Sequence, residues 1–413
     1  MVSDGKKHRD GVFRWTRRLG CGCGAVLLVL LLIVAIIIVV DSIPSERHDM
    51  PASAWQGPPL LVTLRENNSG IHNEIADIRL LKDGVLTPLA LVPTDGEEFT
   101  AVPVDGGFVV VTGRALRTYN WEGKLQEKRD FPGFDGVKSA VIEGFGYAVT
   151  SIPHTREDKN GWWVDYAFIG RRGDIHIVSI SGNSSAVAFC GDKRYIATTV
   201  LSKDDALPNE IAVYELSHDW VIGEPLFKSG IPGTIDSEAG VTVFTDLIVH
   251  LMGCGPGESL VALIDAPETD PTEFWENREN ISVTIDIANK TASYAPAPAK
   301  LLEFSKGQFS RGKTRMEGVS SEGKMLDYDF VSGKFESPWS AEIIPDGNNY
   351  VYSITPEMVV VAPWYDPNDP DMLPFTAYDR QTGRMLTRVE IKSDNSLRQS
   401  VQEIEIIPPG SGI

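Results

Sequence analysis

Four oxygen-bearing side chains lie within six residues in the C-terminal part of this 413-residue chain, namely Asp366, Asn368, Asp369 and Asp371. Carboxylate and amide oxygens are the ligands that Ca²⁺ prefers. The spacing departs from the EF-hand loop, which needs a glycine at its sharp turn and a distal glutamate. Two interpretations stay open: a calcium site, or a solvated acidic turn in a protein without any cofactor.

A phosphate-loop pattern occurs from Gly307 to Thr314, with the sequence G-Q-F-S-R-G-K-T. A nucleotide-binding loop of this kind is followed by a helix whose N-terminus meets the phosphates. The residues that follow include Gly318, Ser320 and Gly323, which disfavour a helix. We therefore expect a glycine-rich turn between two strands here.

Recognisable catalytic motifs are missing from the sequence, which has neither a Gly-x-Ser-x-Gly elbow nor a His-Glu-x-x-His zinc helix. The seven histidines are scattered. His154, with Glu157 and Asp158 nearby in a predicted loop, is the one histidine considered for acid–base chemistry. His250 lies within a predicted strand and is expected to be structural. The sequence predicts no catalytic residue and leaves open whether the protein is an enzyme.

Aromatic and acidic residues gather in and beside four long predicted connections, 153–161, 203–209, 253–279 and 364–373. These connections hold fourteen acidic residues against four basic ones. Long loops often carry function, and aromatic side chains supply contact area at low entropic cost. We expect this loop face to bind a cationic or sugar-like ligand, or a basic protein patch, through Trp162, Trp163, Trp275, Trp364, Tyr365 and Asp366. The alternative is that the loops are tolerated insertions.

A repeated β-hairpin must position these loops. The chain from residue 59 onward consists of short runs rich in Val, Ile, Thr, Tyr and Phe, cut by turn residues. Most successive hairpin turns are 39 to 50 residues apart, which is typical of four-stranded propeller blades. Seven turns predict an all-β, seven-bladed β-propeller, and they lie at 82–84, 121–123, 171–173, 217–219, 288–290, 331–333 and 381–383.

The two ends of the repeat region predict how the ring closes. The first repeat has three strands, Leu60–Arg65, Ile75–Leu81 and Val85–Leu91, and a spare strand, Val401–Ile407, follows the last repeat. We expect the spare strand to become the innermost strand of blade one, because this pairing removes the exposed strand edges.

Two repeats carry a family resemblance. The segment Leu373–Glu390, with Ala377–Arg384 at its turn, resembles the repeat of quinoprotein-like propellers, and Met325–Trp339 is similar. The resemblance, shared at fold level with WD40-like proteins, implies a β-propeller. Because fold does not fix function, it implies no quinone cofactor.

The N-terminal region predicts a membrane anchor. Residues 1–18 hold six basic side chains against two acidic ones, and Ala25 to Val40 is an uninterrupted apolar run. About 20 apolar residues span a bilayer, and basic flanks stay inside. We expect a cytoplasmic tail at 1–18, a transmembrane signal-anchor at 19–41, a linker at 42–58 and an extracytoplasmic propeller at 59–413. The alternative is a signal peptide cleaved after Ala54.

Charge and cysteine content limit the partners. The chain has a formal charge of −19, which disfavours nucleic acid. Cys190 and Cys254 both fall outside the membrane, where a disulfide persists. We place Cys190 at a turn from a first to a second strand and Cys254 behind a second strand. These positions are on opposite faces of the ring, which argues against pairing and leaves it open.

The sequence therefore favours a membrane-anchored extracytoplasmic β-propeller that acts as a binding or scaffold module of the cell envelope. Two alternatives remain: an extracytoplasmic propeller enzyme, either a hydrolase or an oxidoreductase, and an accessory subunit of a membrane complex. An enzyme of this fold would place carboxylates or histidines around the central channel.

Overall fold

The protein is described by a computed structural model. It covers residues 50–51, 55–66, 75–94, 99–132, 136–142, 144–152, 156–158, 161–182, 184–200, 209–231, 249–265, 280–297, 308–309, 315–320, 323–329, 332–340, 350–363, 372–392 and 399–413. The predicted tail at 1–18 and anchor at 19–41 lie outside these residues. Within them, no helix has the length and apolar character needed to cross a bilayer.

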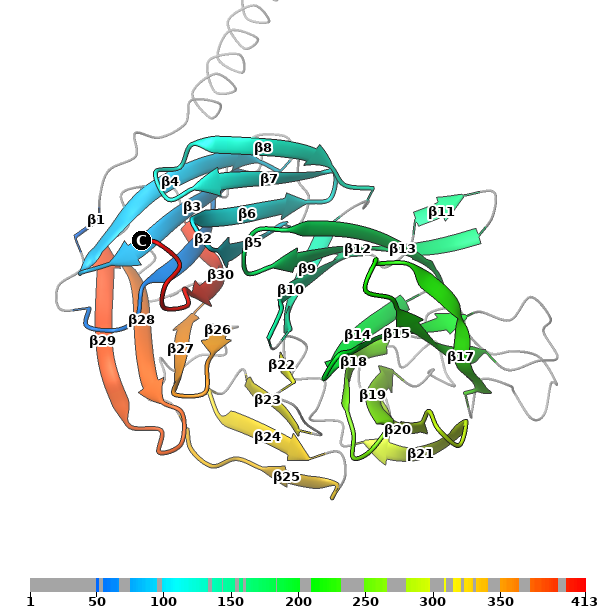
Figure 1. Cartoon of the computed structure of the whole chain (residues 1–413). Coiled ribbons are helices and arrows are strands. Elements are labelled where there is room, and N and C mark those ends of the chain that lie inside the picture. The colour runs from blue at the N-terminus through cyan, green and yellow to red at the C-terminus, as the bar shows by residue number, and fades with distance from the viewer. Residues whose placement is uncertain are drawn as a thin grey trace, which may run out of the picture.

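Seven antiparallel sheets stand around a common axis as propeller blades (Figure 1). The strands of each blade are given from the inner strand outward. Blade two consists of β5 (Phe99–Val104), β6 (Gly107–Thr112), β7 (Ala115–Asn120) and β8 (Leu125–Asp130), and blade three consists of β9 (Gly136–Ile142), β10 (Gly146–Ile152), β12 (Gly161–Gly170) and β13 (Ile175–Ser181). Blade four consists of β14 (Ser184–Cys190), β15 (Lys193–Val200), β16 (Glu210–Leu216) and β17 (Ile222–Gly230). A short strand, β11 (Arg156–Asp158), pairs with the beginning of β12.

The remaining blades follow the same plan. Blade five consists of β18 (Val249–Cys254), β19 (Ser259–Asp265), β20 (Asn280–Asp286) and β21 (Thr291–Ala297), and blade six consists of β22 (Gln308–Phe309), β23 (Arg315–Val319), β24 (Met325–Asp329) and β25 (Lys334–Glu336). Blade seven consists of β26 (Tyr350–Ile354), β27 (Met358–Pro363), β28 (Met372–Asp379) and β29 (Met385–Lys392). Blade one consists of β30 (Gln399–Ile406), β2 (Leu60–Glu66), β3 (Ile75–Lys82), β4 (Val85–Pro93) and β1 (Met50–Pro51).

The seven-bladed propeller predicted from the hairpin spacing is confirmed. Each of the seven predicted turns joins the third and fourth strands of one blade. Gly383 shows why glycine is needed at such a turn: its φ is +68°, and a Cβ there would collide with the Trp339 ring in the preceding blade. Strand β22 lies within the phosphate-loop pattern and strand β23 follows it, while the residues between them, 310–314, lie outside the described residues.

Burial changes steadily from the axis to the rim. In blade two, β5 and β6 are buried along their whole length, whereas every residue of β8 is exposed. Inner strands lie between the faces of two neighbouring blades, so their sequences are nearly continuous apolar runs. The hydrophobic core is consequently divided into clusters between adjacent blades, such as the cluster that joins blades one and seven.

The last strand closes the ring, as predicted. β30 pairs antiparallel with β2, from Leu60 opposite Ile406 to Glu66 opposite Gln399. An irregularity in this pairing leaves Gln402 as an extra residue in β30. The extra residue lets Val401, Ile404 and Ile406 all enter the core between blades one and seven.

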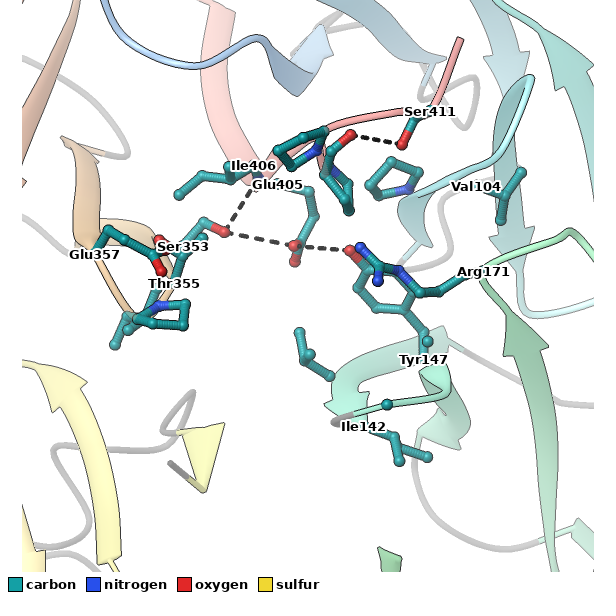
Figure 2. A pocket seen from close by; sticks show the side chains of 18 of the residues that line it. Val104, Ile142, Tyr147, Arg171, Ser353, Thr355, Glu357, Glu405, Ile406 and Ser411 are labelled. Atoms are coloured by element: carbon teal, nitrogen blue, oxygen red, sulfur yellow. Dashed lines mark hydrogen bonds between the residues drawn. The ribbon is translucent and has the colours of Figure 1, made fainter. Parts of the chain in front are cut away.

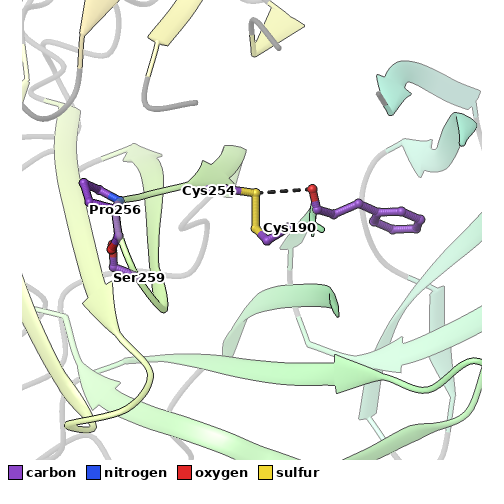
Figure 3. The surroundings of a disulfide bond; sticks show 5 residues. Cys190, Cys254, Pro256 and Ser259 are labelled. Atoms are coloured by element: carbon purple, nitrogen blue, oxygen red, sulfur yellow. Dashed lines mark hydrogen bonds between the residues drawn. A yellow bond between two sulfur atoms is a disulfide. The ribbon is translucent and has the colours of Figure 1, made fainter. Parts of the chain in front are cut away.

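A disulfide joins Cys190 to Cys254, which corrects the expectation that the two residues lie on opposite faces (Figure 3). Cys254 ends the first strand of blade five, not the second, so both cysteines lie at turns from a first to a second strand. The second strand is β19, which lies inside the long loop predicted at 253–279. The disulfide ties two neighbouring inner strands together.

Candidate functional site

A cavity of about 270 Å³ opens near the propeller axis, between turns of several blades (Figure 2). Its walls come from the β5–β6, β9–β10 and β26–β27 turns and from the segment that follows β30. All these turns join first and second strands, or follow a first strand, so they lie at the same end of their blades. Residues from blades far apart in the sequence therefore meet here.

Glu405 is the buried acidic residue of this cavity. It belongs to the closing strand β30, in which Ile404 and Ile406 point into the core between blades one and seven. Strand alternation sends Glu403 and Glu405 to the opposite side, toward the inner strands of blades two and three. The Glu405 side chain lines the cavity, although the residue is only 5% exposed.

The neighbouring carboxylate, Glu403, is held by the inner strands of two other blades. The single Thr100 hydroxyl proton is shared between the two Glu403 carboxylate oxygens, which lie 2.7 and 2.6 Å from the hydroxyl oxygen, and the Ala101 amide donates at 3.0 Å. The Ser139 hydroxyl donates at 2.7 Å. This many donors stabilise an ionised carboxylate. Glu403 thus acts as a hydrogen-bonded link among blades one, two and three.

Glu405 has much weaker partners. The Tyr147 and Ser353 hydroxyls approach its Oε2 atom at 3.4 and 3.5 Å, and no described residue donates a hydrogen bond to Oε1. Burial raises the pKa of the Glu405 carboxyl well above its usual value, the nearby negative charge of Glu403 raises it further, and the two hydroxyls lower it only in part. Glu405 therefore holds a proton at pH values where an ordinary glutamate is ionised.

Tyr147 and Arg171 form the blade-three side of the cavity (Figure 2). Burial raises the pKa of the Tyr147 phenol well above its usual value, and the carboxyl groups of Glu405 and Glu403 raise it further. The positive charge of Arg171 opposes this shift. Tyr147 stays neutral at physiological pH and can donate a hydrogen bond.

An ion pair closes the blade-seven side. The Arg380 guanidinium donates to the Glu317 carboxylate, which belongs to blade six. The other amino group of Arg380 donates to the Thr355 carbonyl oxygen at 3.4 Å. Both side chains are mostly buried, so the charge of Arg380 is neutralised inside the protein. Arg171 is the exposed cation among the described residues that line the cavity.

Glu405→Gln is expected to stabilise the protein at neutral and alkaline pH. The folded state raises the pKa of Glu405 above its usual 4.5. The contribution of Glu405 to the free energy of unfolding is therefore fully present below pH 4.5, and it is lost as the pH rises toward the pKa of Glu405 in the folded protein. Glutamine cannot ionise, so the variant should melt at a higher temperature than wild type at pH 8 and at a similar temperature at pH 4.

Thermal melts between pH 4 and pH 9 test this expectation. Glu403→Gln serves as the matched control, because it removes a carboxylate that accepts several hydrogen bonds. It should lower the melting temperature at neutral pH. A Glu405→Gln variant that melts below wild type at pH 8 would show that ionised Glu405 is needed for stability.

The predicted loop-face residues lie elsewhere or outside the described residues. Trp162 and Trp163 begin β12, opposite Glu157 and Arg156 of β11, at the end of blade three away from the cavity. Trp162 is 40% exposed. The other predicted ligand-binding and metal residues, Trp275, Trp364, Tyr365, Asp366, Asn368, Asp369 and Asp371, fall outside the described residues.

The described residues that line the cavity include no histidine and no metal-ligating cluster. Within the described part of the chain, no group of three or more His, Cys, Asp or Glu side chains is placed to hold a metal ion. His250 lies in the inner strand β18, and His154 is outside the described residues. The cavity residues were missed at the sequence level, although one signal was present: acidic residues 403 and 405 alternate with apolar ones in a strand predicted to be innermost.

Comparisons with known proteins give only distant structural similarities. No protein-family model and no curated protein sequence matches the chain. Apo AztD from Citrobacter koseri is 8% identical, with 84% of this chain and 98% of that chain covered and a TM-score of 0.38. TolB from Acinetobacter baumannii is 12% identical, with coverages of 84% and 82% and a TM-score of 0.36.

The WD40 domain of Neurospora crassa Pan2 is 10% identical, with coverages of 84% and 91% and a TM-score of 0.37. At these scores the fold assignment rests on the sheet topology itself.

Proposed function

We propose that this protein is a membrane-anchored binding module of the cell envelope, and that its propeller holds a small ligand in the cavity between the turns. The supporting observation is Glu405, a nearly buried carboxyl that lines the cavity with one oxygen lacking a described hydrogen-bond partner. Buried polar groups are normally satisfied, so such an atom is a natural contact for a ligand.

The side chains around the Glu405 carboxyl favour a binding site over a catalytic one. The enzymatic alternative requires reactive groups around the channel, and Glu403 and Glu405 do lie there. Glu403, however, is fully occupied by hydrogen-bond donors from blades two and three. The described lining contains no histidine or cysteine that would act as a base or nucleophile beside Glu405.

A fragment screen tests the cavity as a ligand site. Saturation-transfer NMR on the full chain in detergent should find small molecules that bind wild type and are lost in Val141→Trp. Val141 lines the cavity and is 43% exposed, so a tryptophan there fills the space. Val221→Trp is the matched control, because Val221 is 62% exposed and does not line the cavity. A screen whose hits all survive Val141→Trp, or one without hits, would refute the proposal.

The proposed topology places residues 1–18 in the cytoplasm and residues 42–413 outside. The disulfide supports an oxidising compartment. Pairing of β1 with β4 supports an intact chain, since cleavage after Ala54 would remove β1. When intact cells are treated with protease, the propeller should be digested and an N-terminal tag protected. Loss of the tag from outside would reverse the orientation, and a mature chain that starts at Trp55 would establish a signal peptide.

The loop face remains a proposed partner site, directed at a cationic or sugar-like ligand or a basic protein patch. Trp162→Ala, and separately replacement of 266–279 by a tight turn, should reduce recovery of a stoichiometric partner from solubilised membranes at least about tenfold, as loss of a hot-spot residue does. Ile177→Ala is the control, because Ile177 is similarly exposed on the outer strand β13. Full recovery with both changes would exclude this face.

A further inference from the structure

We propose that the cavity binds a small organic cation of the alkylammonium class, with the ammonium group against Glu405 and the carbon chain along the apolar wall. This inference rests on the cavity being the ligand site proposed above. It is carried by the charges around the cavity, by the hydrogen-bonding character of its walls and by its size.

The charges around the cavity favour a cation. The lining includes Asp105, Glu317 and Glu357 against Arg171 and Arg380, in addition to Glu405. Arg380 is neutralised by its ion pair with Glu317. Glu403 adds a negative charge close behind Glu405, strong enough to affect the pKa of Glu405. An anionic ligand would face these carboxylates with Arg171 alone in its favour.

The hydrogen-bonding character of the walls matches an ammonium donor. Four prolines line the cavity, and proline has no backbone N–H to offer a ligand. The Oε1 atom of Glu405 provides an acceptor, since the Tyr147 and Ser353 hydroxyls both donate to Oε2. An ammonium group carries three donors and no acceptor, so it complements such a wall.

The size and composition of the cavity distinguish an organic cation from a metal ion. A volume of about 270 Å³ is far larger than one ion needs, and the apolar side chains of Val104, Ile142 and Ile406 form part of the wall. The described residues also lack a cluster of three metal-ligating side chains. An alkyl chain would instead bury apolar surface against these residues.

Binding should exchange the ligand for a proton. An alkylammonium ion keeps its charge at neutral pH, as lysine does. When it contacts the protonated Glu405 carboxyl, the carboxyl releases its proton to solvent and an ammonium–carboxylate pair forms. Tyr147, Arg171, Glu357, Asp105, the Arg380–Glu317 pair and Glu403 are the other titratable groups around Glu405. Affinity should therefore rise with pH until Glu405 is ionised in the free protein.

Carboxyl ¹³C NMR on the full chain, labelled in its glutamate side chains and held in detergent micelles, tests this exchange. One resonance, identified by its absence in Glu405→Gln, should keep the shift of a protonated carboxyl at pH values where the other glutamates are already ionised. Saturating n-butylammonium chloride should move it to the position of a carboxylate. Equal concentrations of n-butanol or sodium chloride should leave it in place.

Two variants complete the test. Glu405→Gln should weaken n-butylammonium binding about tenfold, the loss expected for one charge-assisted hydrogen bond. Asp192→Asn, which removes an exposed acidic side chain away from the cavity, should leave it unchanged. If n-butanol binds equally well, or Glu405→Gln binds normally, the cavity takes another ligand class and only this inference fails. If no fragment is sensitive to Val141→Trp either, the cavity is not a ligand site.

Discussion

Removal of residues 399–413 should leave the propeller unable to fold cooperatively. The deletion takes away β30 and its pairing with β2, and it exposes the core between blades one and seven. Burial of one large apolar side chain stabilises by about 1.5–3 kcal/mol. Loss of Val401, Ile404 and Ile406 together therefore removes about 5–9 kcal/mol, comparable with the whole stability of a typical domain. Circular dichroism and thermal melts measure the effect.

Point variants in β30 show whether the effect of the deletion comes from loss of the apolar core contacts of this strand. Ile404→Ala should cost about 2–5 kcal/mol, because it leaves a cavity in a packed core. Gln402→Ala changes a half-buried side chain at the irregular position and should cost less than about 0.5 kcal/mol. An unchanged melting temperature after the deletion would show that the ring does not depend on its closing strand.

Loss of the Cys190–Cys254 disulfide should lower the free energy of unfolding by about 4 kcal/mol, the value expected for a loop of this length. The bond spans 64 residues and holds the inner strands of blades four and five. The doubly substituted variant Cys190→Ser/Cys254→Ser should unfold at a lower denaturant concentration than wild type.

Dithiothreitol provides the control for this prediction. It should lower the wild-type midpoint to that of the variant and leave the variant unchanged, because Cys21 and Cys23 lie in the predicted anchor. Intact mass measured with and without alkylation reports the state of the thiols. If the wild-type denaturant midpoint stayed the same after complete reduction of the disulfide, the bond would add nothing to stability.

The architecture was predictable because its signals are local. Each blade ends in a hairpin whose turn needs glycine or a similar residue, and glycines such as Gly84 and Gly383 make these turns visible in the sequence. The closing strand was also predictable, since the first repeat lacked a strand and the last had one too many. Neither inference needed contacts between distant residues.

The disulfide and the cavity were harder to predict for a related reason. The long interval between the turns at 217–219 and 288–290 concealed strand β19 within an acidic, proline-containing stretch, which moved Cys254 to the wrong place in its blade. The cavity arises where turns of blades one, two, three and seven converge. Glu405 becomes buried only through this convergence, and sequence periodicity does not reveal it.

Closure by β30 also sets the order in which the protein can be completed during synthesis. β2 leaves the ribosome long before its partner β30, since the two strands begin at Leu60 and Gln399. At about 5–20 residues per second, the inner edge of blade one waits roughly 20–70 seconds for its partner. During that interval the nascent chain exposes an unpaired edge strand that can associate with other chains. A holding chaperone at the site of synthesis or export would act in this window, and its release would coincide with the arrival of β30.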